Sequence, residues 1–336
     1  MNKIMAAASL TAHVTPLDAG APVAAAGFLG PIPALALEDG TVLLATPEAE
    51  RRIAAHPGAS ILVAVTAGDK FITGGDDGRV VAVSQDGSVQ EIADEKGKWI
   101  DALAARDDGS IAWSSGKNVR SRDSAGGIKS FTAPSSVRGL AFMPKGYKLA
   151  IAHYDGATLW FPNAAAPPDH FKWKGSHLSI TASPDGRFLA TAMQENALHA
   201  WRVADKKDMR MSGYPAKTRS LSWSFDGHWL ATSGADAAII WPFTDKEGTI
   251  NKAPLECGAR NAKVTCVAFH PKSLVVAQGY EDGFLLLCRI PDGAEILVRA
   301  APEGGRAIGA LAWDHAGGRL LFGAADGTAG LLDMPA

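Results

Sequence analysis

The sequence predicts an all-β protein built from repeats, and three observations support this prediction. The chain of 336 residues contains 36 glycines, which is typical of a chain that turns often. Two segments about forty residues apart share one pattern, ITASPDGRFLATAMQENALHAW at 180–201 and LSWSFDGHWLATSGADAAIIW at 221–241. Along both segments apolar residues alternate over short runs, which is the period of a half-buried β-strand.

The shared pattern recurs along nearly the whole chain. The units can be aligned on the residue that ends the third strand-like segment of each. The aligned positions are Ala45, Val83, Arg122, Phe161, Trp201, Trp241, Cys288 and Leu332. Neighbouring positions lie 38 to 47 residues apart, and eight units at one such period indicate a repeat architecture.

Each unit supplies four short strands in order. In the fifth unit the first three are LSITAS, RFLATAM and ALHAW, and MRMSGY follows before the next unit begins. Gly, Asp and Asn residues separate these segments, as expected of tight turns between antiparallel strands. Four strands in about 41 residues are typical of a β-propeller blade, so we predict one propeller domain spanning residues 1–336.

The ends of the chain predict how the ring closes. We expect eight four-stranded antiparallel blades; the competing count is seven, if the first or third unit does not form a blade. The last unit, residues 306–333, has only three strands of its own. A strand at residues 9–14 can supply the fourth, and this pairing would remove the open sheet edges.

The turn sequences SPDGRFLAT and FDGHWLATSG, together with Trp201 and Trp241, resemble those of the WD-repeat family. The resemblance extends from about Ser9 to Leu332. It includes the turn aspartates, namely Asp39, Asp77, Asp155, Asp282 and Asp326. No unit ends in a literal Trp-Asp pair or carries a Gly-His pair at the position typical of the family. The resemblance therefore implies that the hydrogen-bonded His–Ser/Thr–Asp–Trp network of the family is incomplete in most blades.

The resemblance also implies where a binding surface lies, namely at the rim of the central channel. The rim positions flank the start of each first strand or precede the turn Asp. In this chain they include Trp99, Asp101, Arg138, Tyr154, Gln194, Lys217, Arg219, Lys263, Glu281 and Arg306. Trp99 would be an apolar anchor, since aromatic and Arg side chains dominate binding hot spots. The cations Arg138, Lys217, Arg219, Lys263 and Arg306 would favour an acidic peptide or protein loop.

Composition limits the classes of partner. A formal net charge of −2 argues against a dedicated nucleic-acid binder, which should be basic. The longest uncharged stretch, residues 20–37, contains three prolines, which argues against a membrane helix. The N-terminal run MNKIMAAASLTAHV is short for a signal peptide. Three cysteines without a C-x-x-C pair do not suggest a disulfide framework, which fits a reducing compartment. We expect a soluble, cytoplasmic protein that is a monomer on its own.

Catalytic and metal-binding motifs are absent from the sequence. No G-x-S-x-G elbow, H-E-x-x-H pair or Walker loop is present, and we predict no catalytic residue, metal or cofactor. The cluster His153-Tyr154-Asp155 is the nearest to a catalytic group, but Asp155 holds a structural turn position. We therefore predict a non-enzymatic scaffold or adaptor that binds a protein partner. Two alternatives remain: a propeller enzyme, such as a metal-dependent hydrolase or lactonase, and a structural subunit of a larger assembly.

Overall fold

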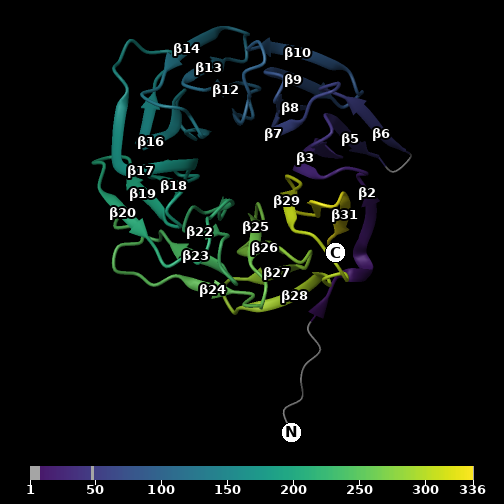
Figure 1. Ribbon diagram of the computed structural model, residues 1–336. Helices are drawn as coiled ribbons and strands as arrows, with labels where there is room; N and C mark the ends of the chain where they lie inside the picture. Colours follow the sequence, from purple (N-terminus) through teal and green to yellow (C-terminus); the bar gives the residue numbers. More distant parts are fainter. Residues whose placement is uncertain (1–7, 47–48, 336) are drawn as a thin grey trace.

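The computed structural model is a ring of β-sheets, and it describes residues 8–46 and 49–335 (Figure 1). These residues form strands β1 to β31 and one short 3-10 helix, η1 (Thr11–His13), so the all-β prediction is confirmed. None of the helical structure in these residues is long and apolar enough to cross a membrane. Residues 1–7, which begin the N-terminal run considered as a signal peptide, lie outside the described part of the chain.

The first three units form separate four-stranded antiparallel sheets. The first sheet contains β3 (Val23–Leu29), β4 (Ile32–Leu37), β5 (Thr41–Ala45) and β6 (Glu50–Ala54). The second contains β7 (Ile61–Ala67), β8 (Lys70–Gly75), β9 (Arg79–Ser84) and β10 (Val89–Asp94). The third contains β11 (Ala102–Ala105), β12 (Ile111–Ser115), β13 (Asn118–Arg122) and β14 (Ile128–Thr132). In each unit the first strand lies toward the centre of the ring and the last at its perimeter (Figure 1).

The fourth and fifth units share one six-stranded sheet. Its strands are β15 (Gly139–Phe142), β16 (Leu149–Trp160), β17 (Asp169–Ala182), β18 (Phe188–Met193), β19 (Leu198–Arg202) and β20 (Asp208–Met211). Strand β16 contains a tight turn at Asp155 and Gly156, whose φ angles are 66° and 132°. Before this turn β16 pairs with β15, and after it β16 pairs with the first half of β17. The second half of β17 pairs with β18.

The expectation of eight separate blades is therefore corrected, because the ring contains seven sheets. The cause is β17, which runs without interruption from the outer strand of the fourth unit into the first strand of the fifth. In the other units a loop separates these two strands, as residues 95–101 do between β10 and β11. Neighbouring sheets pack face to face, and hydrogen bonds do not close the ring.

The last three units complete the ring. The sixth contains β21 (Leu221–Trp223), β22 (Trp229–Thr232), β23 (Ala238–Pro242) and β24 (Leu255–Cys257). The seventh contains β25 (Val264–Phe269), β26 (Val275–Tyr280), β27 (Leu285–Arg289) and β28 (Ala294–Arg299). The eighth contains β29 (Ile308–Trp313), β30 (Arg319–Ala324) and β31 (Thr328–Asp333).

An N-terminal strand completes the last sheet, but it is not the predicted one. Strand β2 (Val14–Asp18) pairs antiparallel with β31, whereas the sequence predicted a strand at residues 9–14. Residues upstream of β2 belong to the neighbouring unit, where β1 (Ala8–Ser9) pairs parallel with β28. The physical reason is Leu10, which is buried in the apolar cluster beneath β28 and donates its backbone N–H to the Leu297 carbonyl at 2.7 Å.

The apolar core lies between neighbouring sheets. Along β4, Ala34 and Ala36 pack toward the second unit, in a cluster with Phe71. Leu35 and Leu37, the alternate residues of the same strand, pack toward the eighth unit. Because each sheet is apolar on both faces, it can bury both of them only between two neighbours.

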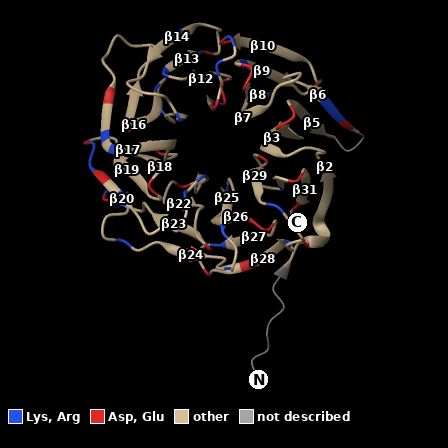
Figure 2. Ribbon diagram, viewed as in Figure 1, with Lys and Arg blue, Asp and Glu red and all other residues tan. Residues whose placement is uncertain are grey.

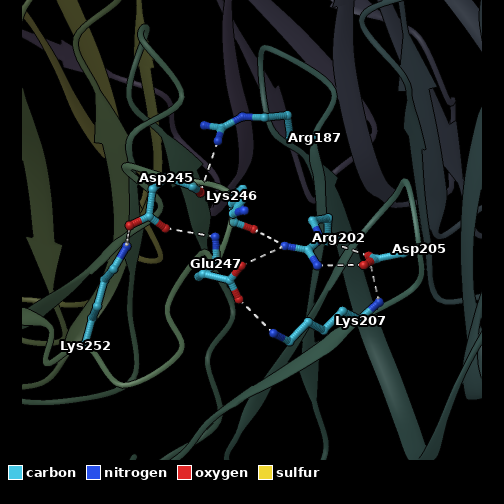
Figure 3. Close-up of polar contacts among 8 residues, drawn as sticks. All are labelled: Arg187, Arg202, Asp205, Lys207, Asp245, Lys246, Glu247 and Lys252. Carbon is cyan, nitrogen blue, oxygen red and sulfur yellow. Dashed lines mark hydrogen bonds and ion pairs between the residues drawn. The ribbon is translucent and has the colours of Figure 1, made fainter.

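The longest spacing between units, 47 residues, corresponds to an enlarged loop at residues 243–254, between β23 and β24. The loop is bound to the fifth unit by polar contacts (Figure 3). Arg187 and Arg202 donate hydrogen bonds to its backbone carbonyls at 3.1 and 2.5 Å. Lys207 forms an ion pair with Glu247 of the loop at 2.7 Å. These contacts attach the enlarged loop of the sixth unit to the fifth unit at the perimeter of the ring.

Candidate functional site

Residues around the first strands of several units line a cavity of about 760 Å³ at the centre of the ring, which we call the central cavity. Four of the predicted rim residues lie in it, namely Lys217, Arg219, Lys263 and Glu281. They come from the sixth and seventh units. The opposite wall comes from the first, second and eighth units. Residues far apart in the sequence therefore meet here.

The central cavity is not purely basic, which corrects the expected charge of the rim. Glu38 and Asp76 line it together with Glu281, so three acids face three cations. Across the whole ring, acidic and basic residues are likewise interspersed rather than gathered in one sector (Figure 2).

Two of the three acids of the central cavity have contacts that its cations lack. Glu281 accepts a hydrogen bond from the Lys263 backbone N–H at 3.0 Å, and Asp76 accepts one from the Ser60 backbone N–H at 2.9 Å. These two carboxylates hold loop backbone in place. By contrast, the side chains of Lys217, Arg219 and Lys263 are exposed, and among the described residues none has an ion-pair partner. Their charges are available to a ligand.

Three predicted rim residues lie at the third and fourth units, away from the central cavity. Trp99, in the loop before β11, is 63% exposed. Arg138 forms an ion pair with Asp101 at 2.5 Å. The expectation that Arg138 is a free partner for anions is therefore corrected, because Asp101 already neutralises its charge.

The remaining predicted residues are dispersed. Gln194 and Arg306 are exposed but do not line the central cavity. Tyr154 is 53% exposed and lines a different cavity of about 990 Å³, between β16 and β17, which we call the unit-four cavity. The sequence thus placed Tyr154 on the rim, and the structure assigns it to a second concave site.

Histidines beside the unit-four cavity form a hydrogen-bonded chain. His153 is buried, and burial lowers its pKa despite the hydrogen bond between its Nδ1 and the Tyr154 carbonyl oxygen at 2.8 Å. Its Nε2 contacts the Thr158 hydroxyl at 2.8 Å, and the same hydroxyl contacts Nδ1 of His170 at 3.1 Å. Within residues 8–46 and 49–335 no three His, Cys, Asp or Glu side chains are grouped to hold a metal ion.

The polar network implied by the sequence resemblance is complete in no unit for which contacts are described. The second unit comes nearest: Nε2 of His56 contacts the Thr73 hydroxyl at 2.8 Å, and Nδ1 lies 3.0 Å from Asp77. In the sixth unit Tyr214 takes the place of His. Its hydroxyl contacts Thr232 at 2.6 Å and accepts a hydrogen bond from Nε1 of Trp241 at 2.7 Å. Different residues therefore form the stabilising side-chain hydrogen bonds in different units.

Sequence reasoning missed Glu38 as a residue of the central cavity. A signal for it was available, because Glu38 precedes the turn Asp39 just as Glu281 precedes Asp282. The lysines Lys172 and Lys174 of the unit-four cavity were also missed. They lie on the continuous strand β17, which the repeat pattern does not predict.

Comparisons with known proteins agree with this architecture. A model of the family described as WD domain, G-beta repeat, matches residues 209–241, in the fifth and sixth units. The computationally designed Ika8 protein has the same fold, with a TM-score of 0.71 at 17% identity, covering 94% of this chain and 98% of that protein.

Several larger proteins are similar over part of the chain. Periodic tryptophan protein 2 of Saccharomyces cerevisiae is 25% identical over 172 residues, 43% of this chain and 18% of that protein. Telomerase protein component 1 of Mus musculus is 29% identical over 164 residues, 48% of this chain and 6% of that protein. WD repeat-containing protein 1-B of Xenopus laevis is 34% identical over 80 residues, 23% of this chain and 13% of that protein. The chain thus matches less than a fifth of the length of each of these relatives.

Proposed function

Since the chain belongs to the WD-repeat family of β-propellers, we propose that it is a non-enzymatic protein-interaction scaffold that binds an acidic segment of a partner protein at the central cavity. Proteins of this family are generally protein-interaction scaffolds. The acidic character of the partner is inferred from this chain alone.

The observation that carries the proposal is a difference in contacts between acidic and basic side chains of the central cavity. Asp76 and Glu281 are engaged with loop backbone, whereas Lys217, Arg219 and Lys263 have no ion-pair partner in the described part of the chain. Carboxylates of a partner would form charge-assisted hydrogen bonds with these cations, and such bonds are stronger than neutral ones. The acids on the wall would reject basic segments and so add specificity.

Trp99 extends the proposed surface over the third unit. Its side chain is the most exposed of the large apolar residues, and an aromatic group on a binding face is a typical hot spot. Asp101 follows Trp99 closely in the chain, and its ion pair with Arg138 offers a polar rim rather than a free charge.

We prefer a scaffold to the two alternatives, a metal-dependent propeller enzyme and a permanent structural subunit. No observation on the described residues specifically favours either of them. A cytoplasmic location and a monomeric state are parts of the same proposal. The three cysteines, all free and buried, suit a reducing compartment.

The test is affinity purification from the native cell with mass spectrometry of the proteins that co-elute. Wild type is compared with the double variant Trp99→Ala/Arg219→Glu and with Lys129→Glu, a matched control on the exposed outer strand β14. We expect one partner to be lost only from the double variant. Retention of every partner by the double variant would overturn the proposed binding face. A stoichiometric divalent metal in the purified protein would favour the enzyme instead.

A further inference from the structure

The unit-four cavity has features of a small-molecule site and plays no part in the scaffold function proposed above. It is lined by the turn in β16, the first half of β17 and the loop before β15. It occurs where β17 passes directly into the next unit, so no loop joins the two units at this position. Its volume of about 990 Å³ is at the upper end of the range for pockets that hold small ligands.

Besides the buried Phe171, two aromatic side chains line this cavity. Tyr154 is half-exposed at its edge. Trp173 lines both this cavity and a neighbouring one of about 310 Å³. One face of the Trp173 ring is covered by His199, with ring centroids 3.9 Å apart and planes 18° apart. The rest of the indole is partly exposed, and flat rings stack well on an aromatic surface.

Two cations share the cavity with these rings. Lys172 and Lys174 flank Trp173 on β17, and all three side chains line the cavity. Both are exposed, and within the described part of the chain neither has an ion-pair partner. The acid at the cavity, Asp155, accepts a hydrogen bond from the Gly175 backbone N–H at 3.3 Å. Two lysines beside one carboxylate leave a net positive charge at the cavity.

The histidine chain fixes a third polar group at the wall. A carbonyl oxygen can only accept, so Nδ1 of His153 carries the proton that points to the Tyr154 carbonyl. Because burial keeps His153 neutral, its Nε2 accepts the proton of the Thr158 hydroxyl. The hydroxyl oxygen then accepts from Nδ1 of His170. This leaves Nε2 of the exposed His170 ring without a hydrogen-bond partner among the described residues.

From this arrangement we propose that the unit-four cavity binds a small molecule combining a flat aromatic ring with a negatively charged group. The ring stacks on Trp173 and Tyr154, and the anion is held by Lys172 and Lys174. The imidazole of His170 provides a further polar contact. The aromatic lining distinguishes this site from the central cavity, which has no aromatic lining residue in the described part of the chain and where three acids oppose the cations.

Phenyl phosphate is the probe, titrated into the full-length protein by calorimetry and by ligand-observed NMR. We expect saturable binding by wild type. Inorganic phosphate and phenol should each bind at least about tenfold more weakly, because each lacks one half of the proposed chemistry. The exposed-residue variant Lys172→Glu/Lys174→Glu should also bind at least about tenfold more weakly, while Lys129→Glu should stay within about twofold of wild type.

Three results would overturn the proposal. They are no saturable binding of phenyl phosphate, equal binding by the lysine double variant, and binding of inorganic phosphate as tight as that of phenyl phosphate. Circular dichroism of every variant checks that the fold is retained. Arg219→Glu, in the central cavity, should leave phenyl phosphate binding unchanged. The outcome is therefore independent of whether the central cavity binds a partner protein.

Discussion

The second and fourth units each contain a histidine hydrogen-bonded to a threonine, but the two networks end differently. In the second unit His56 is enclosed, with Thr73 on one ring nitrogen and Asp77 on the other, and Asp77 also accepts the Arg79 backbone N–H at 2.9 Å. Every polar atom of that imidazole has its partner within the fold. In the fourth unit the chain passes from His153 through Thr158 to His170 and ends at a cavity.

The difference shows what separates a structural network from a potential binding group. A buried network that is fully satisfied stabilises the fold, and removing one member leaves the others unpaired. A network that ends with a free polar atom at a cavity can extend to a ligand. Both networks contain a histidine paired with a threonine, and the residue at the end of each network distinguishes the two roles: Asp77 in the second unit and His170 in the fourth.

The largest expected effect is the contrast between His56→Ala and His170→Ala. His56→Ala removes a buried ring and the hydrogen bonds that it makes with Thr73 and Asp77, so it should lower the free energy of unfolding by about 2–4 kcal/mol. His170→Ala removes an exposed ring and should cost less than about 0.5 kcal/mol. Urea unfolding followed by circular dichroism measures both. Equal losses would mean that the two networks do not differ in role.

The second prediction concerns a buried histidine that has no hydrogen-bond partner. His199 stacks between Trp173 and Trp201, and its Nε2 lies 3.4 Å from the Asp208 carboxylate without forming a hydrogen bond. Burial lowers the pKa of His199 to about 3, and the nearby His177 and Arg210 act in the same direction. In the unfolded chain its pKa is about 6.5.

The folded protein therefore keeps His199 neutral where the unfolded chain binds a proton. Its contribution to stability is fully present above about pH 6.5 and falls by about 1.4 kcal/mol for each pH unit below that. His199→Phe should weaken this pH dependence, since phenylalanine retains the aromatic stack and cannot titrate. The measurement is the urea midpoint at pH 7.5 and pH 5.5. An unchanged pH dependence in the variant would contradict the assignment to His199.

A smaller effect is expected in the sixth unit, where tyrosine replaces histidine in the network. Tyr214→Phe removes the hydroxyl that accepts from Trp241 and contacts Thr232. The indole N–H is then left buried and unpaired, and the free energy of unfolding should fall by about 1–2 kcal/mol. Thermal unfolding of this variant beside wild type provides the measurement. A variant as stable as wild type would mean that the hydrogen bonds of Tyr214, unlike those of His56, do not stabilise the fold.

The smallest effect is expected for Tyr154→Ala at the unit-four cavity. Because Tyr154 is half-exposed, its loss should change the free energy of unfolding by less than about 0.5 kcal/mol. Binding of phenyl phosphate, in contrast, should weaken. A loss of stability without a loss of binding would place Tyr154 among the structural residues, beside Tyr214.

The repeat and the strands could be predicted from the sequence because they depend on local periodicity. The merged sheet could not, since the stretch DHFKWKGSHLSITA alternates on both sides of Gly175 and gives no sign of whether a loop interrupts it. The closing strand was misplaced because the burial of Leu10 against the seventh unit depends on the assembled ring.

The residues of the candidate sites likewise divide into those that the sequence could predict and those that it could not. Positions at the starts of first strands follow from the repeat, which is why Lys217, Arg219 and Lys263 could be named in advance. Their neighbours across the cavity and the pairing of Arg138 with Asp101 depend on distances between units. Periodicity within a unit contains no information on such distances.

The pairing of β2 with β31 has a consequence for the order in which the molecule is made. During synthesis β2 leaves the ribosome about three hundred residues before its partner β31. For most of translation β2 therefore has an unpaired edge, and the eighth sheet can form only once both strands exist. A nascent chain halted before β31 would expose an edge that other chains can pair with, so premature termination carries a risk of aggregation that the finished ring does not.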